Sequence, residues 1–221
     1  MKFTIAFTLA FSTACLGQIG GGGGGGNAGA GVPINGKTPG VLASGPYKSA
    51  FWAEPGLPKH TIFAPMDPPP GLKLPVMVWG NGACSSNGTF FRRSLFEVAS
   101  HGFFVIANGP PTGGAGQTKY TMQMEALSWI ERNAGKGQFA HIDGTRVAAA
   151  GQSCGGLETY EAAVKAGPQK VHVVGIFNSG EFGTSKTSLQ VKQPIFYFLG
   201  GSSDIAYQNV SSSISSHVVV N

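Results

Sequence analysis

The 221-residue sequence is short of charge and has no long apolar run. Only 11% of its residues are charged, and the net charge of +5 is spread over isolated lysines and arginines, of which only Arg92 and Arg93 are adjacent. No basic stripe is interleaved with aromatic residues, which argues against nucleic-acid binding. No apolar stretch is long enough to cross a bilayer, so stable membrane insertion is not expected.

Cysteine is scarce as well, with three residues in the chain. The first, Cys15, follows MKFTIAFTLAFSTA, in which one lysine precedes an apolar run and small residues; this pattern predicts a secretory signal peptide over residues 1–17. Cleavage after Ala14 or Gly17 fits, whereas a lipid-anchored Cys15 is disfavoured because Ser12 stands where a lipoprotein signal usually has leucine. We therefore expect a secreted, extracellular protein.

Glycine, by contrast, is abundant, with 35 residues, and an unbroken glycine run occupies positions 20–26. Such a run has no side chains to bury and a high chain entropy, so residues 18–40 are expected to form a disordered leader. Residues 41–208 carry the pattern of one folded domain. The serine-rich residues 209–221 form an atypical tail.

Buried strands alternate with amphipathic helices through the predicted domain, which indicates an α/β fold with a mostly parallel, doubly wound sheet and helices on both faces. The predicted strands are residues 49–54, 61–64, 74–79, 103–107, 146–151, 171–177 and 194–199. The predicted helices are residues 87–100, 118–133 and 156–166.

Ligands of such sheets bind beyond the carboxyl ends of the strands. This rule places residues 80–84, Ser153, residues 178–181 and residues 200–204 along one rim. Cys84 and Cys154 then lie in facing loops, and secretion permits them to form a disulfide. The alternative is a pair of buried free thiols.

The most informative motif is Gly151-Gln152-Ser153-Cys154-Gly155, between an apolar strand and a helical pattern. It fits the G-x-S-x-G nucleophile elbow, in which a sharp turn exposes a serine hydroxyl at a helix N-terminus. Glycine is needed on both sides because larger side chains would clash. The alternative is a glycine-rich turn whose serine caps the helix. Cys154 itself is a poor candidate for the nucleophile, because its side chain would point away from the cleft.

A serine nucleophile needs a base and an acid that orients it, which follow the serine in the order acid, then histidine. Asp204 is the only aspartate after Ser153, in the loop after an apolar strand, and is the predicted acid. Glu181 is the alternative acid, and an Asx-type turn is the alternative role of Asp204. Glu158 and Glu161 are expected to be solvated.

The histidine is harder to assign, because only His172 and His217 follow the serine. His172 precedes Asp204 and opens a strand, which indicates a structural or surface histidine. His217 has the required order and is the candidate base, although it lies in the polar tail with no helix or strand pattern before it. The predicted oxyanion donors are the backbone N–H groups of Cys154 and of Gly82 or Ala83.

With these residues assembled, the chain resembles secreted esterases of the α/β-hydrolase superfamily, near the cutinase, polyester hydrolase and dienelactone hydrolase branches. The segments VMVWGNGAC, ASHGFFVIA, AAAGQSCGG and IFYFLGGSSDIAY carry the resemblance in matching order. It implies hydrolysis of small or polymeric carboxylic esters through an acyl-enzyme, with Ser153 as nucleophile and Asp204 as acid. It implies no metal and no organic cofactor, and we expect a monomer.

Two departures from that family matter. Asn81-Gly82 stands where many relatives have His-Gly, which is tolerable because the donor is backbone. The relatives also continue past the acid through a helix, the histidine loop, a last strand and a closing helix, so this chain is expected to lack the last strand and helix. The alternative function is therefore a catalytically impaired, truncated hydrolase-fold protein without the triad histidine, whose strand at residues 195–199 has an uncovered apolar face.

Two further predictions concern glycosylation and the substrate pocket. Asn87-Gly-Thr and Asn209-Val-Ser are glycosylation acceptors if the chain is secreted by a eukaryote. Phe90, Phe91, Trp79 and Tyr207 are candidates for an apolar acyl pocket, with a place in the core as the alternative.

Overall fold

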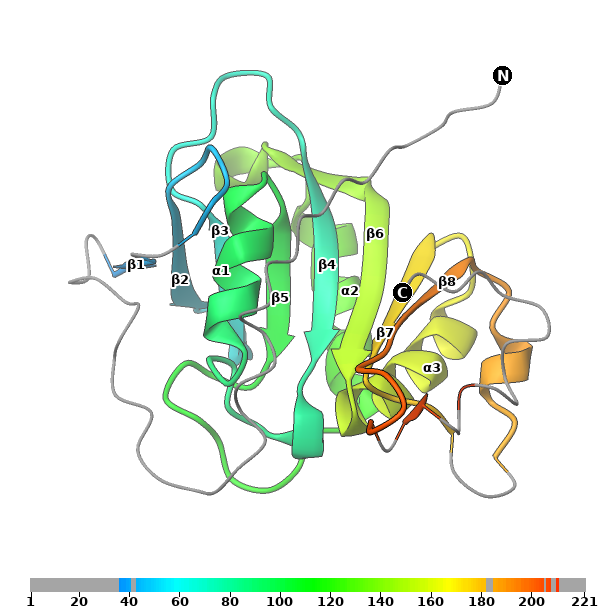
Figure 1. Cartoon of the computed structure of the whole chain (residues 1–221). Helices are drawn as coiled ribbons and strands as arrows, with labels where there is room; N and C mark the ends of the chain where they lie inside the picture. The colour runs from blue at the N-terminus through cyan, green and yellow to red at the C-terminus, as the bar shows by residue number, and fades with distance from the viewer. Residues whose placement is uncertain (1–35, 41–42, 182–184, 205, 208–209, 211–221) are drawn as a thin grey trace.

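A mixed sheet of eight strands forms the centre of the molecule (Figure 1). The computed structural model describes residues 36–40, 43–181, 185–204, 206, 207 and 210, so the predicted signal peptide, Asn209 and His217 lie outside the described residues. The strands are β1 (Thr38–Pro39), β2 (Ser49–Glu54), β3 (Leu57–Pro65), β4 (Leu74–Gly80), β5 (Phe104–Asn108), β6 (Ile142–Gln152), β7 (Val173–Phe177) and β8 (Ile195–Phe198). Three α-helices are described: α1 (Arg92–Ser100), α2 (Tyr120–Asn133) and α3 (Cys154–Ala166).

The sheet divides into an antiparallel and a parallel part. Its strand order is β1-β2-β3-β5-β4-β6-β7-β8. The pairs from β1 to β5 are antiparallel, and the pairs from β5 to β8 are parallel. The carboxyl ends of β4, β6, β7 and β8 therefore meet at one edge, which confirms the predicted α/β class.

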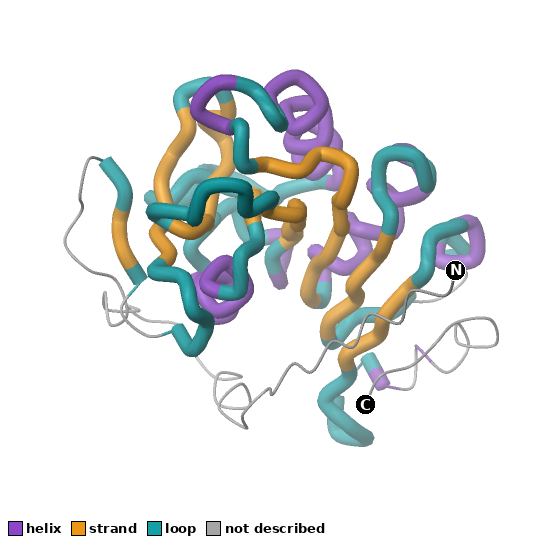
Figure 2. The backbone as a smooth tube through the Cα atoms, turned by 90° about the horizontal axis from the view of Figure 1, so that it is seen from above, coloured by secondary structure: helices purple, strands orange, loops and turns teal. Residues whose placement is uncertain are grey.

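Helices cover both faces of the sheet, as Figures 1 and 2 show. Alternate side chains along each strand point to opposite faces, which makes two cores. On one face, Met77 and Trp79 of β4 lie in the same hydrophobic core as Leu95 and Phe96 of α1. On the other face, Val76 and Val78 lie in the same hydrophobic core as apolar side chains of α2 and α3.

Helix α1 begins later than predicted, at Arg92 instead of residue 87. Residues 87–91 form a turn instead, because the Oδ1 atom of Asn87 accepts hydrogen bonds from the backbone N–H and the hydroxyl of Thr89. Short polar side chains of this kind compete with helical hydrogen bonding and favour turns. The ends of the other predicted helices and strands differ from the structure by one to a few residues. Strand β1 was not predicted: Thr38 and Pro39 pair with β2, although they fall within residues 18–40, which were expected to be disordered.

Strand β6 begins earlier than the sequence pattern indicates. Its pairing with β4 runs from Ile142 but skips three residues between Asp143 and Val147. The Asp143 carboxylate holds this bulge by accepting hydrogen bonds from Thr145 and Arg146. No helix in the described part of the chain is long and apolar enough to span a membrane.

Candidate functional site

The backbone at Ser153 is strained. Ser153 links β6 to α3 with φ 52° and ψ −119°, a region that residues with a side chain seldom occupy. Its N–H donates to the Phe177 carbonyl at 3.0 Å, and its carbonyl accepts from the Ser179 hydroxyl at 2.7 Å and from the Gly156 N–H at 2.8 Å. The predicted strand, sharp turn and helix are therefore present, and β7 with the residues that follow it supports the turn.

Close backbone packing explains the glycines around this serine. A Cβ atom on Gly151 would lie 2.2 Å from the Gly155 carbonyl oxygen. A Cβ on Gly155 would lie 2.2 Å from the carbonyl of Gly80, and one on Gly156 would lie 2.5 Å from the Cβ of Ser179. The start of α3 thus touches the backbone of β4 and the loop after β7, and only glycine permits this contact.

A disulfide joins the loop after β4 to the start of α3, the two segments that carry the predicted oxyanion donors. Cys84 and Cys154 are bonded, as predicted, with their Cα atoms 5.1 Å apart. Because Cys154 is the first residue of α3, no carbonyl of that helix accepts its N–H. Ala83 and Cys84 both have positive φ angles, 55° and 48°, so the facing loop is also held in a sparsely populated conformation.

The loop after β8 brings Asp204 next to the residues that support Ser153. Asn178, directly after Phe177, donates from Nδ2 to the Asp204 carboxylate at 2.6 Å. The backbone N–H groups of Gly200 and Ala206 also donate to this carboxylate. Partial burial acts to raise the pKa of Asp204, but these three hydrogen bonds outweigh it and hold the pKa below its usual value. The bond from Ala206 is also the Asx-type contact expected as the alternative.

The alternative acid, Glu181, is engaged in its own loop. Its carboxylate accepts hydrogen bonds from the hydroxyls of Ser185 and Ser188 and from the backbone N–H of Thr187. Partial burial opposes their effect, yet they lower the pKa of Glu181. These bonds give Glu181 a structural role at the turn before residues 188–190.

Each histidine of the described residues has a hydrogen-bond partner away from Ser153 and Asp204. His172 accepts from the Val147 N–H, at the end of β7 opposite to Phe177, in keeping with the predicted structural role. His60 is buried against the Met122 carbonyl, and burial lowers its pKa. His101 pairs with Glu97, and His141 contacts the Leu72 carbonyl. His217 therefore stays a prediction outside the described residues.

The prediction that Glu158 is solvated is wrong. Its exposed fraction is 6%, and its carboxylate accepts hydrogen bonds from the Thr118 hydroxyl at 2.7 Å and from Asn108 Nδ2 at 3.1 Å. Burial is the main cause that raises its pKa, against the effect of these two bonds. Helical periodicity could have found it, since Gly155, Glu158 and Ala162 lie on one buried face of α3. Glu161 is exposed, as predicted.

The side chain of Asn81 was also missed as a functional feature. It is completely buried, and its Nδ2 atom lies within hydrogen-bond distance of the carbonyls of Ser85, Asn87 and Asn108, at 3.0, 3.1 and 2.8 Å. Its Oδ1 atom accepts from the Trp79 indole. Asn81 thus fixes the whole loop after β4, although only the backbone of this loop entered the prediction.

Aromatic rings form a continuous series beside this loop. Trp79 is buried between Phe91 and Phe177, with ring centroids 5.5 and 5.4 Å away. Phe177 stacks on Phe198 at 4.2 Å, and Phe91 contacts Phe90, which is 55% exposed. Trp79 is therefore part of the core, whereas Phe90 offers an apolar ring to solvent.

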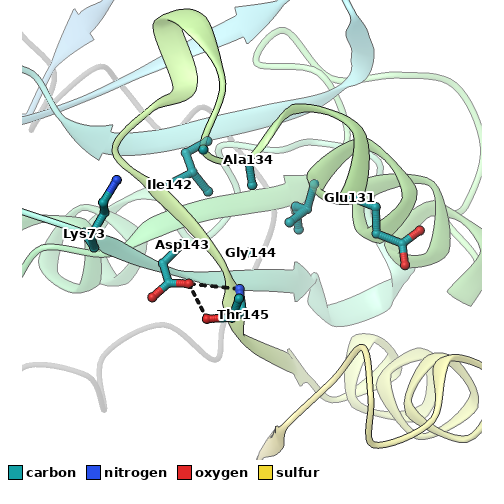
Figure 3. A pocket seen from close by; sticks show the side chains of 9 residues that line it. Lys73, Glu131, Ala134, Ile142, Asp143, Gly144 and Thr145 are labelled. Atoms are coloured by element: carbon teal, nitrogen blue, oxygen red, sulfur yellow. Dashed lines mark hydrogen bonds between the residues drawn. The ribbon is translucent and has the colours of Figure 1, made fainter.

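A pocket of about 420 Å³ lies at the other end of the sheet, where the β6 bulge meets the end of α2 (Figure 3). Lys73, Glu131 and Asp143 are its charged residues. Asp143 is turned to Thr145 and Arg146, as its hydrogen bonds show. The pocket contains neither a candidate nucleophile nor a histidine, so we place the candidate site at the Ser153 rim.

Among the described residues, no group of three or more His, Cys, Asp or Glu side chains could hold a metal ion.

Asn87 is the predicted glycosylation acceptor that the structure describes. It is half-buried, and its side-chain oxygen accepts a hydrogen bond from Thr89.

Neither a protein-family model nor a curated protein matches the chain. The function therefore has to be argued from the site itself.

Proposed function

We propose that this protein is a secreted serine hydrolase of the α/β-hydrolase type, which cleaves carboxylic esters with Ser153 as the nucleophile. The observation that carries the proposal is the backbone conformation of Ser153, with φ 52° between a parallel strand and a helix. Strain of this kind persists only where the surroundings enforce it, and it is concentrated at functional sites. A serine on such a turn matches the nucleophile elbow.

The proposed reaction begins with attack of the Ser153 hydroxyl oxygen on the ester carbonyl carbon. The hydroxyl proton passes to a base, for which His217 is the candidate, and the carbonyl oxygen becomes an oxyanion. The N–H groups of Cys154 and of Gly82 or Ala83 stabilise this charge, helped by the N-terminus of α3. The protonated base then gives its proton to the departing alcohol, and water releases the acid from the acyl-enzyme.

Asp204 suits the part of the orienting acid. Its lowered pKa keeps it ionised at neutral pH, and an ionised carboxylate stabilises a neighbouring imidazolium. Its bond to Asn178 ties it to the residues that support Ser153.

The aromatic series favours esters with an apolar or aromatic acyl group, small or polymeric. Phe91 lies 3.6 Å from the position that a Cβ of Gly82 would occupy, so the rings reach the predicted oxyanion loop. Phe90 extends this apolar surface into solvent.

The test is covalent labelling of the full chain by a fluorophosphonate, together with hydrolysis of p-nitrophenyl acetate. We expect labelling at Ser153, and loss of both labelling and hydrolysis in Ser153→Ala, because removing the nucleophile leaves only residual catalysis. Ser128→Ala is the matched control, since Ser128 bonds to the Met124 carbonyl within α2. Equal activity in parent and Ser153→Ala would contradict the proposal.

A second candidate is a hydrolase-fold protein with impaired catalysis. The partners of the four described histidines favour it, because none of these residues is poised beside Ser153. A serine without its base is a weak nucleophile. Labelling of Ser153 no faster than that of surface serines would identify this case.

A further inference from the structure

A buried polar cluster lies beneath the rim, between the loop after β4 and helix α3. Its members are Asn81, Asn108, Thr118 and Glu158, which come from four separate segments of the chain, and none is more than 6% exposed. The cluster belongs to no step of the proposed reaction, and its only ionisable group is Glu158.

Hydrogen bonds connect this cluster from the start of α3 to the predicted oxyanion loop. Glu158 accepts from Thr118 and from the side chain of Asn108. The backbone carbonyl of Asn108 in turn accepts from Asn81, which fixes residues 81–87. Glu158 Oε2 also lies 3.2 Å from where a Cβ of Gly80 would stand, so the carboxylate borders the end of β4 directly.

A carboxyl group is a costly choice for this position. Burying it is unfavourable unless hydrogen bonds compensate, and an apolar side chain of similar size would pack without that cost. A carboxylate offers what an apolar group cannot, because its two oxygens can accept from two segments at once. Here those segments are the end of β5, through Asn108, and the segment that leads into α2, through Thr118.

We propose that Glu158 is a positioning residue that, through Asn108 and Thr118, holds the oxyanion loop at a fixed distance from the start of α3. The inference rests on the proposed function, since the loop and the helix carry the two predicted oxyanion donors. Glu158 does not touch the substrate in this arrangement. It fixes the distance between the backbone N–H of Cys154 and that of Gly82 or Ala83, and this distance decides how well the two donors stabilise the oxyanion.

The first experiment compares Glu158→Gln with Glu161→Gln in the full chain. Both changes remove one carboxylate from α3, but Glu161 is exposed. We expect Glu158→Gln to lower kcat about tenfold and to leave KM within about twofold, because an amide N–H replaces one of the two accepting oxygens while the substrate contacts remain. Glu161→Gln should match the parent in both constants. Equal kcat values for the two variants would overturn the inference.

A second pair of variants covers the case in which Glu158→Gln fails to fold. Thr118→Val removes the donor at nearly constant volume and should lower kcat in the same way, whereas Thr118→Ser keeps the hydroxyl and should restore it. A parental kcat in Thr118→Val would count against the inference.

A third readout separates this inference from the proposed function. The rate at which dithiothreitol reduces the Cys84–Cys154 disulfide reports how firmly the oxyanion loop is held against the start of α3, whether or not the protein hydrolyses esters. We expect reduction about tenfold faster in Glu158→Gln and Thr118→Val than in Glu161→Gln and Thr118→Ser. If the parent shows no Ser153-dependent activity, the proposed function fails and these rates alone decide, with equal rates in all four variants overturning the inference.

Discussion

The strained turn at Ser153 requires that Gly155, two residues later, has no side chain. The backbone of Gly155 faces the carbonyl of Gly80 and the N–H of Asn81, so a methyl group there would meet backbone atoms at 2.2 to 2.7 Å. Backbone atoms of a central strand cannot move aside as a flexible side chain can. The glycine is thus required by packing between β4 and α3.

Gly155→Ala should therefore destabilise the protein by about 3 kcal/mol, at the upper end of overpacking effects. Urea unfolding followed by circular dichroism measures the change. Gly114→Ala is the matched control, because a methyl group there would meet only side-chain atoms of Ser86 and Pro110 at 3.3 Å or more. Equal unfolding midpoints in the two variants would show that the contact at Gly155 can relax.

Glu158 should make stability depend on pH. Burial, with a smaller effect of the like charge of Glu161, raises the pKa of Glu158 in the folded state above its ordinary value of 4.5. The folded state then holds a proton that the unfolded state has already lost, so the free energy of unfolding falls as the pH rises from about 4.5 through the raised pKa.

The measurement is the free energy of unfolding between about pH 4.5 and pH 8 for the parent, Glu158→Gln and Glu161→Gln. Glutamine does not ionise, so Glu158→Gln should lose this part of the decline in stability, whereas Glu161→Gln should keep most of it, because the charge of Glu161 contributes less to the raised pKa than burial does. Parallel curves for the parent and Glu158→Gln would contradict the shift.

These two residues also show what the sequence can predict at this scale. Gly155 belongs to a local motif whose spacing reflects the geometry of a single turn, so its requirement was predictable. Helical periodicity indicates the buried face of Glu158, but not its hydrogen-bond partners Thr118 and Asn108, which are distant in sequence and come together only in the folded sheet. Asn81 escaped prediction for the same reason, since one of its carbonyl partners is Asn108.

At the scale of the elements, the Cys84–Cys154 disulfide links two positions that are 70 residues apart in sequence. Such a cross-link restricts the unfolded chain and typically contributes about 2–4 kcal/mol. It also joins the loop after β4 to the start of α3, so its loss affects the rim directly.

Reduction should thus lower the free energy of unfolding by about 2–4 kcal/mol. The measurement is urea unfolding with and without dithiothreitol. The double variant Cys84→Ala/Cys154→Ala serves as the control, because it should have the stability of the reduced parent and should not respond to the reductant. A response of the double variant to the reductant would assign the effect to something other than this disulfide.

At the level of elements, apolar runs predicted the strands better than the polar segments predicted helix ends. Buried strands such as β4 and β5 are read directly from consecutive apolar residues. The start of α1 depends instead on Asn87, whose side chain accepts a hydrogen bond from the Thr89 N–H and so favours a turn over a longer helix. The bulge in β6 likewise depends on the hydrogen bond that Asp143 accepts from the Thr145 N–H. These are competitions between local hydrogen bonds of similar strength, which hydrophobic periodicity does not register.

At the scale of the whole molecule, the described helices cover only part of the sheet face on which α1 lies. Helix α1 packs against β2, β3 and β5, and Figure 1 shows it in front of that half of the sheet. The strand register places Phe196 of β8 in line with Gly175, Ala150 and Trp79, on the same face as α1. Phe196 is 39% exposed, and no described helix lies in front of β8 in Figure 1. Among the described strands β8 is also the last in the order, so an exposed apolar side chain lies on a strand whose outer edge pairs with no described strand.

This combination predicts that β8 limits solubility. Phe196→Thr should slow aggregation several-fold at high protein concentration, because it removes an exposed ring while threonine keeps a high preference for strands. Light scattering over time at elevated concentration measures the rate. Leu189→Thr is the matched control, since Leu189 is 56% exposed but lies in the turn Ser188–Gln190, outside the sheet edge. If both substitutions slow aggregation equally, exposed apolar area alone is responsible; if Phe196→Thr aggregates at the parental rate, the edge at β8 is not the site of association.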